Sequence, residues 1–189
     1  ERPVKGYMAL VSAHFRTLLQ YRAAALAGLG TQLFWGLIRV MIFEAFYSAN
    51  VNAQPMELSQ VVTYVWLGQA FLVMLPWNVH RDVQALIRSG GVSYELLRPL
   101  DLYTAWYSRA LAFRSAPTLL RAAPLLTVAG LFLGMEAPAS WSAAVAFAVA
   151  MAGALLLSCA ITTLLTISLM WTVSGQGVTQ LMTAAVTVF

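Results

Sequence analysis

The sequence predicts an all-α integral membrane protein, a polytopic helix bundle with an amphipathic interfacial helix at its N-terminus. Of its 189 residues, 60% are hydrophobic and 10% are charged, and the mean hydropathy is +0.75. Ordinary soluble domains carry about 25% charged residues. A helix needs about 20 apolar residues to cross the bilayer core, and four runs of the chain are long enough. We therefore expect a single transmembrane domain over residues 1–189.

Residues 1–22 are predicted to form the amphipathic helix, because their apolar and polar side chains separate at helical spacing. One face holds Tyr7, Met8, Val11, Phe15, Leu18 and Leu19, and the opposite face holds Lys5, Ser12, Arg16 and Gln20. The pattern suits a helix in the headgroup region with its basic side chains towards anionic lipid. It equally suits a helix packed on the protein's own cytoplasmic side, and the two interpretations are compatible.

The predicted spans are residues 23–47, 61–79, 111–135 and 141–171. Residues 178–189 provide about half a crossing, which predicts the start of a fifth span in a C-terminally incomplete chain, after a tight turn at Ser174 to Gly177. The third span is less regular than the others. Arg114 and Arg121 share a face, and Pro117 and Pro124 interrupt the hydrogen-bond ladder. We expect this helix to begin near Tyr103 and to turn its arginines towards protein, water or the inner headgroups.

The distribution of arginine and lysine along the chain predicts its orientation in the membrane. Basic residues precede the first span and follow the second, whereas the connections at residues 48–60 and 136–140 contain none. The positive-inside rule then places the N-terminus and residues 81–101 in the cytoplasm.

Residues 81–101, RDVQALIRSGGVSYELLRPLD, form a polar segment between two spans. Apolar residues at helical spacing predict one short amphipathic helix up to Arg88, broken at Ser89, Gly90 and Gly91. A second short piece ends before Pro99, and Asp101 is expected to cap the next helix. This segment is too small to bury its own apolar side chains, which are Leu86, Ile87, Leu96 and Leu97. The surfaces that would bury them are the membrane surface, the protein's own helix ends or a groove on a soluble partner.

The pattern IRSGGVSYELLRPLDLY (Ile87 to Tyr103) directly after a second span resembles the cytoplasmic loop of ABC-2 type transporter permeases, in particular the bacterial branch of roughly six-span drug-export and viologen-export subunits. Residues 5–22 are similar to that family's elbow helix. The resemblance implies that residues 81–101 are the coupling segment, seated on an ATP-binding cassette ATPase. The implied contact residues are Arg81, Asp82, Leu86, Ile87, Arg88, Tyr94, Glu95, Leu96, Leu97 and Arg98.

Nothing in the chain predicts an enzyme. The single lysine, Lys5, is not part of a phosphate-binding loop, so ATP is expected to bind to the partner and no cofactor to this chain. His14 and His80 lie at predicted membrane boundaries and form no HExxH metal motif. Cys159 lies alone in the fourth span, where a buried small residue is the simpler interpretation.

Four residues are candidates for a substrate path: Gln32, Trp35, Arg39 and Gln69. The first three share a face of the first span with Gly28 and Gly36. Charged residues inside a bilayer usually face a bundle interior, although Arg39 could instead form a structural pair or extend outward to the headgroups. In the fourth span a stripe of small residues predicts close packing or a subunit contact more readily than a binding site. That stripe consists of Ala148, Ala152, Cys159, Thr162, Thr163 and Thr166.

The sequence as a whole therefore predicts the membrane-spanning subunit of an ATP-driven exporter. The resemblance implies a separate ATPase subunit, a second permease subunit in a homodimer or heterodimer, and the bacterial cytoplasmic membrane. The alternative is a transporter or channel that needs no ATPase, or a structural membrane subunit. Ion-driven transport usually requires an acid within the membrane, and Glu44, the only acid in the spans, lies near an outer end.

Overall fold

The computed structural model describes residues 2–20, 22–49, 54–77, 79–172 and 176–188, and within these residues it contains helices and no strand. Three of the described helices are long and apolar enough to cross a membrane, over Leu26–Ala49, Leu102–Phe132 and Trp141–Thr172. The predicted fold class, an all-α membrane helix bundle, is confirmed.

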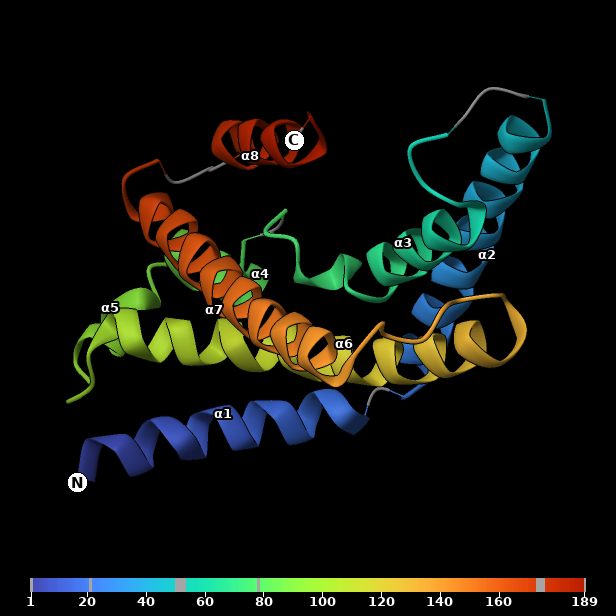
Figure 1. The fold of residues 1–189 in the computed structure, drawn as a ribbon. Helices are drawn as coiled ribbons and strands as arrows, with labels where there is room; N and C mark the ends of the chain where they lie inside the picture. The colour runs from blue at the N-terminus through green and yellow to red at the C-terminus, as the bar shows by residue number, and fades with distance from the viewer. Residues whose placement is uncertain (1, 21, 50–53, 78, 173–175, 189) are drawn as a thin grey trace. The chain divides into compact units, whose positions relative to one another are not determined.

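The elements follow one another along the chain as Figure 1 labels them. They are α1 (Arg2–Gln20), α2 (Arg22–Ala49), α3 (Leu58–Ala70), the 3-10 turn η1 (Leu72–Met74), α4 (Arg81–Arg88), α5 (Val92–Leu96), α6 (Leu102–Phe132), α7 (Trp141–Thr172) and α8 (Gln176–Val188). The predicted turn at Ser174 to Gly177 lies partly outside the described residues. The predicted start of a fifth span falls on α8.

The chain divides into two compact units, which are described separately. Unit 1 comprises residues 1–18, 74–115 and 150–189. Unit 2 comprises residues 19–73 and 116–149. The two long helices α6 and α7 each contribute one part to either unit.

In unit 2, α2 and α3 lie side by side (Figure 1). Their close approach depends on Gly36, where a Cβ atom would lie 2.3 Å from Cζ3 of Trp66. The Trp66 indole is fully buried and packs in one apolar cluster with Leu125 of α6. Small residues let helices approach closely in lipid, where dispersion contacts hold them together. Gly36 therefore positions the core of this unit.

In unit 1, α1 packs against the chain itself. Tyr7, Val11 and Phe15 are partly buried, as the predicted apolar face requires, while Ser12 and Arg16 are exposed. Met8, predicted on the same apolar face, is 67% exposed. The Tyr7 hydroxyl accepts a hydrogen bond from the backbone N–H of Asp101 at 3.0 Å. Contact of α1 with lipid headgroups stays a prediction.

The residues predicted as the second span, 61–79, do not form one regular helix. α3 starts earlier, with a capping box between Glu57 and Gln60, and ends at Ala70. The η1 turn follows, and the described residues from there to α4 form no regular element. Pro76 prevents a regular helix from continuing through residues 75–79, because proline lacks an N–H and disfavours helical geometry in the residue before it. At 1.5 Å per residue, α3 is about 20 Å long, so passage of the broken segment through the bilayer stays a prediction.

The third predicted span is more regular than expected. α6 continues through Pro117 and Pro124 without a break, as membrane helices can when surrounding protein satisfies the freed carbonyls. It begins where the sequence placed it. Asp101 Oδ2 accepts hydrogen bonds from the N–H and the hydroxyl of Thr104, both at 2.7 Å.

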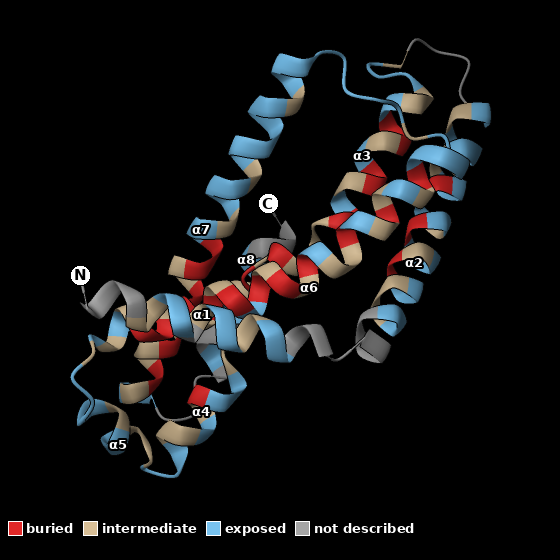
Figure 2. Cartoon of the chain, turned by 90° about the horizontal axis from the view of Figure 1, so that it is seen from below, coloured by how far each residue is buried: buried red, intermediate tan, exposed pale blue. Residues whose placement is uncertain are grey.

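The fourth predicted span falls on α7, whose two halves differ in burial. In Figure 2 its first half is almost entirely exposed, whereas buried residues appear in the second half. The buried residues run from Ser158 to Leu169. Only the second half therefore packs extensively against described residues.

Candidate functional site

The segment from Arg81 to Asp101 lies wholly in unit 1 and has the predicted form of two short helices. α4 and α5 are separated at Ser89 to Gly91, and Gly90 has a φ of 75°, a left-handed conformation that favours glycine. The predicted break at the glycine pair is confirmed.

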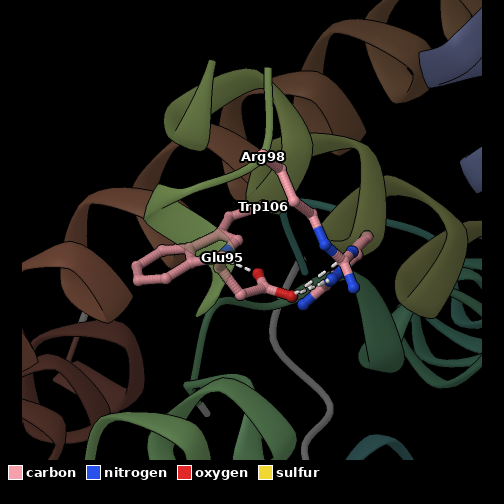
Figure 3. Close-up of polar contacts among 4 residues, drawn as sticks. Glu95, Arg98 and Trp106 are labelled. Atoms are coloured by element: carbon pink, nitrogen blue, oxygen red, sulfur yellow. Dashed lines mark hydrogen bonds and ion pairs between the residues drawn. The ribbon is translucent and has the colours of Figure 1, made fainter. Parts of the chain in front are cut away.

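Glu95 fixes α5 to the first turns of α6. Its Oε1 accepts a hydrogen bond from Nη2 of Arg109 at 2.6 Å, and its Oε2 accepts one from Nε1 of Trp106 at 3.0 Å. Arg98 lies 3.7 Å from the same carboxylate. Figure 3 shows the Glu95 carboxylate between the Trp106 indole and the arginine side chains. Glu95 thus makes several contacts within the chain, and its predicted contact with a partner stays a prediction.

The charges around Glu95 alter its protonation. Burial raises the pKa of this carboxyl, but the hydrogen bonds from Arg109 and Trp106 and the positive charges of Arg109 and Arg98 outweigh burial and lower it. Glu95 is therefore ionised at neutral pH, and the contact between α5 and α6 is charge-assisted.

The two ends of the segment also carry shifted groups. Burial lowers the pKa of His80, and the positive charges of Arg109, His14 and Arg114 act in the same direction against the opposing effect of Asp82. Hydrogen bonds from the Thr104 side chain and backbone lower the pKa of Asp101. At neutral pH the segment therefore starts at an uncharged histidine and ends at an ionised aspartate cap.

The predicted contact residues differ in exposure. Leu86 and Ile87 are half-buried beside Val83, which was not among the predicted contacts and is 1% exposed. The exposed members of the predicted set are Arg81, Asp82, Arg88, Tyr94, Leu96, Leu97 and Arg98. Leu97 is 82% exposed and Tyr94 is 76% exposed. We call the apolar surface formed by Tyr94, Leu96 and Leu97 the apolar tip.

The chain just before α4 is held by a buried arginine whose role was not predicted. Arg114 of α6 is 5% exposed. Its Nη1 donates to the carbonyl oxygen of Leu75 at 2.6 Å, and its Nη2 donates to the hydroxyl of Thr162 on α7. The hydroxyl of Ser158 donates to the carbonyl oxygen of Met74. Irregular backbone in a membrane protein is tolerated where buried groups satisfy its carbonyls, and Pro76 was the sequence signal for that break.

Two of the four predicted path residues meet in unit 2. Nε2 of Gln32 on α2 donates to the carbonyl oxygen of Gln69 near the end of α3 at 2.9 Å. Both side chains are buried, at 4% and 1% exposure. Trp35 and Arg39 are exposed on α2 and do not join them. The predicted common face therefore separates into a packed stripe of Gly28, Gln32 and Gly36 and an exposed edge.

The small residues of α7 mostly pack. Cys159, Thr162, Thr163 and Thr166 are buried, and the three threonine hydroxyls donate to carbonyls one turn earlier. Ala148 and Ala152 are exposed. Across the described part of the chain, no group of three or more His, Cys, Asp or Glu side chains is placed to hold a metal ion.

Comparison with known proteins identifies one family. The model of a family described as ABC-2 family transporter protein matches residues 33–189. No curated protein and no solved structure matches the chain significantly.

Proposed function

Because the chain belongs to the ABC-2 family of transporters, we propose that it is the membrane-spanning subunit of an ATP-driven exporter, coupled to a separate ATP-binding cassette subunit. Members of this family are membrane components of ABC transport. The proposal adds the ATPase partner, the docking segment and the outward direction of transport.

The observation that carries the proposal is the apolar tip on an anchored segment. Tyr94 and Leu96 lie on a helix of five residues, and Leu97 directly follows it, so this short element cannot bury them. Exposed Arg88 and Arg98 flank them. An apolar anchor with a charged rim is the form in which short helices dock into protein grooves. Leu86 and Ile87, half-buried already, support the segment more than they would contact a partner.

Docking of the ATPase on the apolar tip would drive transport only if movement of the tip were transmitted to the membrane-spanning helices. Glu95 links α5 to α6 through Trp106 and Arg109, and Arg114 links the chain before α4 to α6 and α7. A rigid contact of this kind lets each nucleotide state of the partner favour one arrangement of the helices. ATP would be bound and hydrolysed by the partner, and this chain would need no cofactor.

The remaining features follow from the same proposal. The chain would lie in the bacterial cytoplasmic membrane with its N-terminus and residues 81–101 inside. It would pair with a second permease subunit, identical or related, because one subunit encloses only half of a pathway. Gln32 and Gln69 are better placed than Trp35 and Arg39 to face such a pathway, since they are buried among helices.

The test is co-purification of the tagged full chain with a co-expressed ATP-binding cassette subunit from the same organism. Leu97→Asp places a charge on the apolar tip and is expected to reduce recovery of the ATPase at least about tenfold, which corresponds to about 1.4 kcal/mol. Ser93→Asp is the matched control, because Ser93 is exposed on the same short helix but is polar. Equal recovery of the ATPase with both variants would contradict the docking role of the apolar tip.

A further inference from the structure

Two arginines on one face of α6 have different surroundings. Arg114 donates to carbonyl and hydroxyl oxygens, as described above. Arg121, seven residues later, makes no hydrogen bond or ion pair with any residue that the structure describes, and its Nε is buried. A charged side chain inside a membrane span is unfavourable unless it is paired or hydrated. Arg121 therefore calls for an acceptor from outside the described chain.

The neighbouring helix leaves room for this guanidinium. A Cβ atom on Gly28 of α2 would lie 2.3 Å from Cζ of Arg121 and 2.6 Å from its Nε. Only glycine lets the guanidinium lie directly against α2 at this position. The guanidinium is thereby placed one helical turn from Gln32, on the same stripe of α2.

The next turn adds buried polar atoms without partners. Gln32 and Gln69 are 4% and 1% exposed, and Oε1 of each side chain has no hydrogen-bond partner. The large majority of buried side-chain polar atoms in proteins are hydrogen-bonded. The Nε of Arg121 and two amide oxygens at neighbouring levels of one helix pair thus lack the partners that buried polar groups normally have.

The helices α2, α3, α6 and α7 contain no acidic residue close to Arg121. The only acidic residue in α2, α3, α6 and α7 is Glu44. It lies sixteen residues beyond Gly28 on α2, which is about 24 Å along the helix axis. An internal salt bridge to that side chain is therefore out of reach.

We propose that Arg121, Gln32 and Gln69 form a binding site in unit 2 for the headgroup of an anionic amphiphile. A phosphate or carboxylate oxygen accepts hydrogen bonds from Arg121, and a hydroxyl or N–H of the same headgroup donates to the amide oxygens. The exposed apolar side chains Leu26 of α2 and Leu119 of α6 offer a surface to the hydrocarbon tail. The amphiphile is either a membrane phospholipid or the transported molecule, which share this chemistry.

The inference rests on the proposed permease role for its place in transport, but the binding itself needs no ATPase. The test uses the full chain in an uncharged maltoside detergent, titrated with dansyl-undecanoic acid and followed by dansyl fluorescence. The uncharged methyl ester of the probe is the reference ligand. If the wild-type chain bound the probe but did not co-purify with the ATPase, that result would contradict the proposed function alone.

Arg121→Gln is expected to weaken binding of the acid at least about tenfold, while binding of the ester stays unchanged. Arg121→Lys keeps the charge and is expected to retain most of the affinity. Arg16→Gln removes an equal charge from the exposed face of α1 and is expected to leave the affinity unchanged. Equal binding by wild type and Arg121→Gln, or an equal loss with Arg16→Gln, would overturn the proposal.

Gly28→Ala gives a second variant that need not unfold the protein. The three atoms nearest its Cβ all belong to the flexible end of the Arg121 side chain, so it displaces the guanidinium and is expected to weaken binding of the acid several-fold. Unchanged affinity in this correctly folded variant would count against the site.

The two sources of the amphiphile are separated by mass spectrometry of lipids that co-purify with the chain. Anionic phospholipid retained by wild type and lost from Arg121→Gln identifies a membrane lipid. Probe binding without such retained lipid identifies a free anionic amphiphile. Both results support the site, and absence of both overturns it.

Discussion

The Nη2 atom of Arg109 lies 2.6 Å from Oε1 of Glu95, which joins a five-residue helix to a span of 31 residues. A helix as short as α5 has little stability of its own. Its position on α6 therefore depends on this contact and on the hydrogen bond from Trp106.

The first prediction concerns the pH dependence of that contact. Because the pKa of Glu95 is lowered in the folded protein, the contact stabilises fully above the unfolded pKa, about 4.3, and its contribution is lost as the pH falls through the folded value. The difference in melting temperature between wild type and Glu95→Gln is expected to be largest at neutral pH and to shrink below about pH 4. A difference that stays constant over this range would exclude the ionised pair.

The second prediction concerns Arg114 of α6, the buried arginine that binds the carbonyl oxygen of Leu75. Arg114→Met leaves the carbonyl of Leu75 without its donor and is expected to destabilise the protein by about 2–5 kcal/mol, since each unsatisfied buried group costs about 1–3 kcal/mol. Unfolding can be followed with a thiol-reactive dye at Cys159, which is the sole cysteine and fully buried. Arg114→Lys retains one charged donor group and is expected to lose less stability than Arg114→Met. Wild-type stability of the methionine variant would contradict the assigned role.

The third prediction concerns the contact between α2 and α3. Gly36→Ala places a Cβ 2.3 Å from the buried Trp66 ring, and overpacking of this kind destabilises by about 1–3 kcal/mol. Gly30→Ala is the matched control on the same helix, because its Cβ would meet nothing within 4 Å. Alanine there is expected to be neutral or to stabilise by up to about 1 kcal/mol. Similar melting temperatures for the two variants would argue against the close approach.

The fourth prediction concerns orientation. In a Cys159→Ser background, Ala137→Cys is expected to react with a membrane-impermeant maleimide in intact cells, because the connection after α6 is predicted to face outward. Ser93→Cys is expected to react only after the membrane is opened. Both positions are exposed in the structure. The reverse labelling pattern would invert the topology.

Local signals in the sequence predicted the local structure well. The glycine pair at Gly90 and Gly91 marked the break between α4 and α5, and Asp101 marked the start of α6. Each depends on backbone geometry within a few residues, such as a left-handed φ at Gly90 or a carboxylate accepting from the N–H of Thr104. The family resemblance of the segment is confirmed by the match over residues 33–189.

Tertiary relationships were harder to predict. Hydropathy alone favoured a continuous helix over residues 61–79, although Pro76 pointed to a break. Arg114 could be recognised as an arginine that needed protein or water, but its acceptors on Leu75 and Thr162 lie 39 and 48 positions away along the chain. Helical periodicity grouped Arg39 with Gln32, and only the packing of α3 against α2 separates them.

The exposed first half of α7 has a consequence for biogenesis. Trp141 and Val149 are 88% and 67% exposed, and the helix contains an 18-residue window of mean hydropathy 2.4. Such a stretch can partition into lipid by itself, before any neighbour has been synthesised, and assemble laterally afterwards. We expect the insertion machinery to release α7 as an independent stop-transfer unit, with the threonine-rich second half recruiting its partners only later.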